Sequence, residues 1–207
     1  MVDTQIRPSD VTKFPIIEAF LSVPREKFVP DGKREAAYIG ENFKIGQSRV
    51  ILEPRTLAKL LDALDIRNDE LVLDIGPGLG YSSAVISPMA EVVIAVEDDS
   101  SMANEAEEIL TEVGADNVVI QIGKLEDGAP EHGPYDVIIL QGGVEKIPSS
   151  IVNQLKNGGR VGAIFVEEGL GTAKIGFKLN DKINWRYSFN AAAPVLPGFF
   201  KQKDFVL

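Results

Sequence analysis

Short apolar runs alternate with helix-like segments over residues 71–166. The runs are, in chain order, residues 71–75, 92–96, 118–122, 137–140 and 160–166. They are continuous rather than alternating, which indicates strands covered on both faces. Between them, residues 81–89, 102–113 and about 149–156 have the spacing of helices, and Gly114 is placed as a C-cap. Repeated strand–helix–strand units predict an α/β fold with a doubly wound, mostly parallel sheet.

The two ends of the chain follow other patterns. Residues 15–21 have helical spacing, and the two prolines in 23–30 predict an ordered but irregular connector. Leucines at 57, 60, 61 and 64 predict a helix that begins near Pro54. Alternating residues on both sides of a turn at 180–181 predict an antiparallel hairpin at the sheet edge. We therefore expect a small N-terminal helical and irregular appendage over residues 1–50 and the main domain over 51–207.

Composition narrows the functional classes. The 207 residues include 31 acidic and 21 basic side chains, for a net charge of -10, and no cysteine. This charge disfavours broad binding to nucleic acid, and the lack of cysteine excludes disulfides and thiolate metal sites. The chain has no apolar stretch of about 20 residues and no signal-peptide pattern at its start. We expect a soluble cytoplasmic protein with no nucleic-acid partner, no membrane partner and no metal.

A glycine-rich segment carries the strongest chemical signal. The sequence Asp74-Ile75-Gly76-Pro77-Gly78-Leu79-Gly80-Tyr81 follows a predicted strand and opens a predicted helix. Glycines there allow a sharp turn and a close approach of the backbone to a ligand. A dinucleotide-binding G-x-G-x-x-G would need glycine at position 81, but the third glycine is Gly80. The form D-x-G-x-G-x-G resembles motif I of the class I S-adenosylmethionine-dependent methyltransferases.

An acidic residue at the end of the next strand agrees with this resemblance. Glu97 directly follows the run 92–96, and a carboxylate there can accept hydrogen bonds from ribose hydroxyls. The alternatives are a plain strand–helix connector, a solvated charge at Glu97, and an Asp74 that only orients the loop. His132, the one histidine, is interpreted as a surface residue. The predicted cofactor-binding residues are Asp74, Gly76, Pro77, Gly78, Gly80, Tyr81, Glu97, Asp98, Lys124 and Leu125.

Several segments together resemble the protein-L-isoaspartate O-methyltransferase family. Residues 23–30, VPREKFVP, match its V-P-R-E-x-F-V-P block, and the similarity extends over roughly residues 1–166. The resemblance implies a Rossmann-like class I methyltransferase fold and S-adenosylmethionine as cofactor. It also implies methylation of the side-chain carboxylate of isoaspartyl residues, a step in the repair of damaged proteins. The implied partners are isoaspartyl-containing proteins or peptides.

Two positions depart from the family pattern. The family has G-Q-T-I-S-Q-P before the helix at 57–64, and its serine falls on Leu52, which cannot donate a hydrogen bond. Lys124 replaces an acid that would lie near the adenine amine. Arg49 and Arg55 are possible substitutes for positioning a carboxylate. The candidate catalytic residues are those of the acceptor loop, namely Gln47, Ser48 and Arg49.

These departures leave other functions open. One is a protein that binds S-adenosylmethionine or S-adenosylhomocysteine without turnover. Another is a methyltransferase for a different small acceptor, with Trp185, Tyr187 and Phe189 lining an aromatic pocket rather than packing the hairpin. A nicotinamide oxidoreductase is a more distant alternative.

Overall fold

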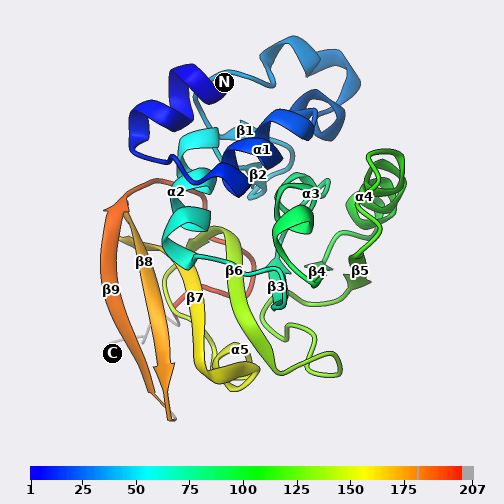
Figure 1. Cartoon of the computed structure of the whole chain (residues 1–207). Helices are drawn as coiled ribbons and strands as arrows, with labels where there is room; N and C mark the ends of the chain where they lie inside the picture. Colours follow the sequence, from blue (N-terminus) through cyan, green and yellow to red (C-terminus); the bar gives the residue numbers. More distant parts are fainter. Residues whose placement is uncertain (181, 202–207) are drawn as a thin grey trace, which may run out of the picture.

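The fold is built on a seven-stranded mixed sheet with the order β5-β4-β3-β6-β7-β8-β9 (Figure 1). The computed structural model describes residues 1–180 and 182–201. Neighbouring strands from β3 to β7 pair in parallel, while β8 and β9 are antiparallel. The strands are β3 (Leu71–Ile75), β4 (Val92–Glu97), β5 (Val118–Ile122), β6 (Tyr135–Val144), β7 (Leu155–Glu167), β8 (Leu170–Leu179) and β9 (Lys182–Asn190). The predicted Rossmann-like, mostly parallel sheet with a C-terminal antiparallel hairpin is confirmed.

The strand order reverses beside β3. Strands β4 and β5 extend the sheet on one side, and the chain then crosses to β6 on the other. In open α/β sheets, ligands bind outside the carboxyl ends of the strands at such a switch point. The ends of β3 and β4, Ile75 and Glu97, therefore mark the edge where a ligand site is expected.

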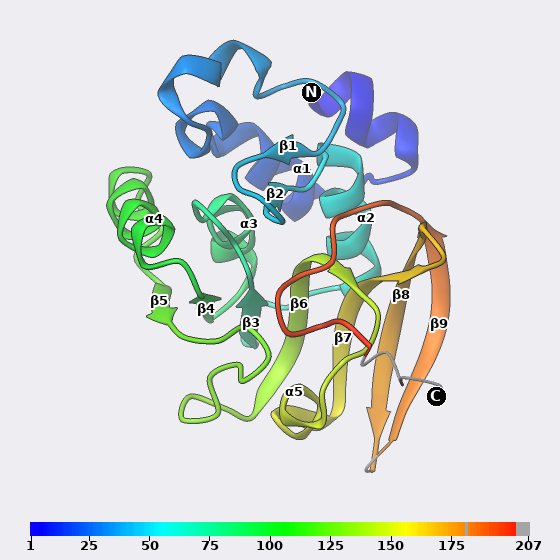
Figure 2. The same ribbon diagram turned by 180° about the vertical axis from the view of Figure 1, so that it is seen from behind.

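Both faces of the sheet are covered, as the continuous apolar runs predicted. Val72 of β3 joins the hydrophobic cluster under the helices, whereas Leu73 joins the cluster on the other face. The first face carries α1 (Phe14–Ser22), α2 (Pro54–Leu64), α3 (Tyr81–Ile86) and α4 (Ser100–Glu112). The second is covered by α5 (Ser149–Asn153), by loop residues and by the C-terminal Leu196 and Phe199 (Figure 2). Within the described ranges, no helix has the length and apolarity to cross a bilayer.

The N-terminal fifty residues pack over α2 and α3 as short helical turns. Besides α1, they form one- or two-turn helices at Val2–Ile6, Arg7–Ser9, Arg25–Phe28 and Asp31–Ala36, and a two-stranded sheet of β1 (Phe43–Lys44) and β2 (Val50–Ile51). Arg25 is completely buried: its Nε donates to the carbonyl of Ala37 at 2.8 Å and its Nη2 to that of Leu52 at 2.9 Å. Its guanidinium also lies 4.6 Å from the ring centre of Tyr81. Arg25 thus ties the proline-flanked block to the chain just before α2.

Several predicted boundaries differ from the structure, and those of α3, α5 and β7 have clear physical reasons. Helix α3 ends at Ile86, and residues 87–89 form a 3-10 turn because Pro88 has no amide hydrogen for an α-helical bond. Helix α5 ends at Asn153 rather than 156, and β7 begins at Leu155 rather than 160. The early start of β7 is possible because a register shift separates the pairing of Leu155 with Tyr135 from the regular ladder.

The C-terminal hairpin places its three aromatic residues differently. Phe189 is buried, and Trp185 packs edge-on against Phe165 with ring centres 4.7 Å apart. Tyr187 is 65% exposed, so these aromatic residues do not line a common pocket. The turn predicted at 180–181 includes Asp181, which lies outside the described residues.

An ion pair joins β7 to the residue before β3, and hydrogen bonds from the same arginine reach the end of α2. Arg160 of β7 donates to the two carboxylate oxygens of Glu70 at 2.6 and 2.8 Å, and to the carbonyls of Leu64 and Asp65. Burial by itself raises the pKa of Glu70, but hydrogen bonds from Arg160 and from the Arg67 amide outweigh it and hold the pKa below 4.5.

We expect Glu70→Gln to lower the free energy of unfolding by about 1–2 kcal/mol at pH 7, because it removes a charge-assisted pair. The pKa of Glu70 is lowered in the folded state, so its contribution is present above pH 4.5 and is lost as the pH falls through the folded-state pKa. Urea unfolding at pH 7 and pH 3 measures this difference. An equal loss at both pH values would contradict the role of the charge. The exposed Glu91 offers the matched control, Glu91→Gln.

Candidate active site

The glycine turn leaves β3 at the switch point. Gly76, Gly78 and Gly80 have φ angles of 76°, 61° and 92°, a region that side chains disfavour. The Gly76 amide donates to the carbonyl of Val96 at 2.9 Å, which fixes the turn beside β4. A β-carbon at Gly80 would lie 3.2 Å from the Leu110 side chain, so this glycine also permits close packing on α4. The predicted connection of strand, turn and helix is confirmed.

Asp74, in β3 just before the glycine turn, accepts hydrogen bonds from residues of α3 and β6 on either side of it. One carboxylate oxygen accepts from the hydroxyls of Ser82 and Ser83, both at 2.6 Å, and the other accepts from Nε2 of Gln141 at 2.7 Å. Complete burial raises the pKa of Asp74, and these hydrogen bonds oppose the rise. Both oxygens are engaged, so Asp74 positions the turn between α3 and β6. Gln141 was not predicted, although a polar residue at the end of an apolar run was a visible signal.

Glu97 closes β4 with a carboxylate that has no solvent exposure. One oxygen accepts from the amide of Gly78 at 2.8 Å, and the other accepts from the amides of Asp98 and Asp99 at 3.1 and 3.2 Å. Burial raises the pKa of Glu97 above its ordinary value, whereas the charge of Arg49 and the amides lower it. The carboxylate is thus held against the glycine turn, where the sequence predicted it.

Arg49 lies directly on this site, at the end of a tight turn between β1 and β2. Its Nη2 forms an ion pair with the Glu97 carboxylate, and the side chain is only 7% exposed. A β-carbon at Gly76 would lie 2.6 Å from its Nη1, and one at Gly78 would collide with Cδ1 of Ile45. Residues 45–49 therefore cover the glycine turn. The contact joins a predicted acceptor residue to a predicted cofactor residue, which the sequence did not indicate.

The remaining predicted residues are divided between core and surface. Pro77, Tyr81 and Leu125 are buried, and Ser48 is half-buried, while Gln47, Asp98 and Lys124 are exposed. The ring of Tyr81 packs edge-on against Phe20 and Phe28. Its side chain therefore points into the N-terminal part of the core rather than along the strand ends.

Three further residues can now be placed. Leu52, at the position of the family's serine, is 1% exposed and belongs to the core under the helices. The guanidinium of Arg55 lies 5.5 Å from the ring centre of Phe189, away from the Arg49–Glu97 pair. His132 is exposed in the loop before β6, which confirms its interpretation as a surface residue.

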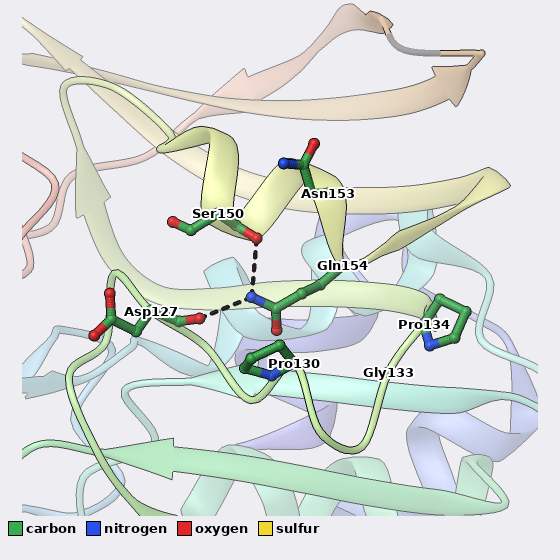
Figure 3. Close-up of a pocket in the computed structure, with 7 residues that line it drawn as sticks. All are labelled: Asp127, Pro130, Gly133, Pro134, Ser150, Asn153 and Gln154. Carbon is green, nitrogen blue, oxygen red and sulfur yellow. Dashed lines mark hydrogen bonds between the residues drawn. The ribbon is translucent and has the colours of Figure 1, made fainter.

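A cavity of about 700 Å³ lies elsewhere, at the amino ends of β6 and β7 (Figure 3). Pro134 directly precedes β6 and Gln154 directly precedes β7, so the cavity is at the edge opposite Glu97. The side-chain Nε2 of Gln154 donates to the backbone carbonyls of Asp127 and Ser150 at 2.7 and 2.9 Å. None of the predicted site residues lines this cavity.

Comparisons with known proteins show the family of this chain. The family model described as protein-L-isoaspartate(D-aspartate) O-methyltransferase matches residues 1–185. The chain is 40% identical to a protein-L-isoaspartate O-methyltransferase of Syntrophus aciditrophicus over 161 residues, which cover 78% of this chain and 74% of that protein. The enzyme of the same name from Opitutus terrae is 35% identical over 78% of this chain and 69% of that protein.

Solved structures of proteins with the same family name match the fold over most of this chain. A protein-L-isoaspartate O-methyltransferase matches with a TM-score of 0.83 and 26% identity, over 93% of this chain. The match spans 63% of the length of that structure's chain. A putative protein-L-isoaspartate O-methyltransferase from Plasmodium falciparum, solved with S-adenosyl-L-homocysteine, matches with a TM-score of 0.78 at 20% identity, over 92% of this chain and 93% of that one.

The sheet order and the glycine turn beside a strand-end glutamate define a class I methyltransferase. The family match over residues 1–185 goes further. The chain belongs to the protein-L-isoaspartate(D-aspartate) O-methyltransferase family, as the VPREKFVP block predicted.

Proposed function

We propose that this chain transfers a methyl group from S-adenosylmethionine to the side-chain carboxylate of isoaspartyl residues in damaged proteins. Family membership supports this reaction. The structural observation that carries it is the buried Glu97 carboxylate, held by the Gly78 amide at the carboxyl end of β4. Damaged proteins or peptides that contain isoaspartate are the proposed partners, and the cytoplasm is the proposed compartment.

The residues around Glu97 fit this cofactor in their chemistry. A carboxylate can accept hydrogen bonds from two ribose hydroxyls, and three glycines bring the backbone close to a ligand. Asp98 follows at the same strand end, while the backbone of Lys124 and Leu125 follows β5 and would border the adenine. Bound there, S-adenosylmethionine supplies a methyl group on a positively charged sulfur.

The acceptor chemistry makes few demands on the protein. A carboxylate is already ionised at neutral pH, so the site needs no strong general base. One acceptor oxygen forms a bond to the methyl carbon as the carbon–sulfur bond breaks, and the bonding pair stays on sulfur. The protein contributes alignment and the exclusion of water. Gln47, Ser48 and Arg49 are the residues proposed to contact the methyl acceptor. The guanidinium of Arg49 can form paired hydrogen bonds with a carboxylate.

A methyl-transfer assay on an isoaspartyl peptide tests this proposal, with the matching aspartyl peptide as control. We expect methylation of the first peptide and none of the second. Calorimetric titration with S-adenosylhomocysteine is run on the same protein. Cofactor binding without turnover would instead favour a non-catalytic binding protein, an alternative that rests on Leu52 having no hydrogen-bond donor in its side chain. Turnover with another acceptor alone would contradict the proposed substrate.

A further inference from the structure

Residues 45–49, here named the cover turn, fill the space in front of the glycine turn. Ile45 packs on Gly78 and the Arg49 guanidinium packs on Gly76. On the far side, a β-carbon at Gly46 would lie 3.1 Å from Cε of Met102 in α4, so the cover turn also contacts the helix after β4. The chain itself thus occupies the surface of the glycine turn.

The Arg49 guanidinium is poorly satisfied in this position. Nη2 contacts Glu97, but Nε and Nη1 are buried and have no hydrogen-bond partner within the part of the chain that the structure describes. Buried donors without partners cost free energy, and a buried ion pair gains little after desolvation. The contact between Arg49 and Glu97 therefore adds little net stability to the position in which the cover turn lies on the glycine turn.

We infer that the cover turn is a self-occluding element in which Arg49 occupies the ribose position on Glu97, so that the cofactor binds only after Arg49 leaves. The inference rests on the proposed role of Glu97 in holding the cofactor. Both oxygens of Glu97 accept from backbone amides, and Arg49 adds a side-chain contact to the oxygen that also accepts from the Gly78 amide. Ribose hydroxyls and Arg49 compete for the same carboxylate.

The cover turn can move as a unit. Its backbone hydrogen bonds, from the amides of Ile45 and Gly46 to the carbonyl of Arg49, are internal. Within residues 1–180 and 182–201, the side-chain hydrogen bond from Arg49 to Glu97 is the one that joins the cover turn to the cofactor edge. The flanking strands β1 and β2 have two residues each, so little ordered structure opposes the movement.

Such a cover lowers the apparent cofactor affinity by the fraction of molecules that are open. We expect Arg49→Met, which keeps the apolar stem and removes the charge, to bind S-adenosylhomocysteine about tenfold tighter than the wild type in calorimetry. Arg34→Met is the matched control, because Arg34 is exposed and pairs with Asp31 instead. Unchanged or weaker binding by Arg49→Met would overturn the inference. Failure of every variant to bind would instead refute the proposed function.

A second measurement follows the movement directly and does not depend on Arg49→Met folding. The chain has no cysteine, so Gln47→Cys gives a single labelling site on the exposed tip of the cover turn. We expect a nitroxide at this position to change its mobility in the electron paramagnetic resonance spectrum when S-adenosylhomocysteine is added. A spectrum that stays constant while calorimetry shows saturation would overturn the inference.

Discussion

Replacing Glu97 by alanine is expected to weaken the binding of S-adenosylhomocysteine at least tenfold. Hydrogen bonds to a charged carboxylate contribute about 1.5–3 kcal/mol each, and two ribose hydroxyls would be affected. The same substitution removes the partner of Arg49 and so favours the open cover turn, which offsets part of the loss. The net effect should still exceed the roughly 1.4 kcal/mol that corresponds to tenfold.

Calorimetric titration of Glu97→Ala measures this loss, with Glu91→Ala as control. Glu91 is exposed and lies just before the opposite end of β4. Glu97→Gln should fall between wild type and alanine, because its amide keeps one acceptor oxygen and loses the charge. A dissociation constant that stays the same in Glu97→Ala would show that the ribose is held elsewhere.

Much of the sheet and the glycine turn at its carboxyl edge could be predicted because both depend on local pattern. Continuous apolar runs mark strands buried on two faces, and the glycines at 76, 78 and 80 mark backbone angles that other residues disfavour. Glu97 could be placed beside the glycine turn because the carboxyl ends of neighbouring parallel strands share an edge. None of these inferences needs knowledge of contacts between distant segments.

The contacts that fill the site depend on such distant segments and could not be predicted. Arg49 and Glu97 are 48 positions apart, and nothing in either local pattern indicates that they pair. The same holds for Gln141, which reaches Asp74 across 67 positions. Local spacing predicts that residue 155 is helical, but in the structure it pairs with Tyr135 as the first residue of β7.

Leu52 departs from the family pattern in sequence, and the structure shows that it is a core residue. In sequence, a leucine stands at the position where the family pattern has a serine. In the structure, Leu52 is 1% exposed within the core under the helices, and its carbonyl accepts from Nη2 of the buried Arg25. Its side chain therefore contributes to stability, whatever the acceptor loop does in catalysis.

We accordingly expect Leu52→Ser to lower the free energy of unfolding by about 3–5 kcal/mol, because it leaves a cavity and buries a hydroxyl. The melting temperature should fall by roughly 10 °C. Urea unfolding measures the loss, and Leu52→Met is the control, since it conserves volume and should cost less than about 1.5 kcal/mol. A serine variant as stable as the wild type would show that the site around Leu52 opens to water or repacks. Any change in methylation by Leu52→Ser must then be compared at matched folded fractions.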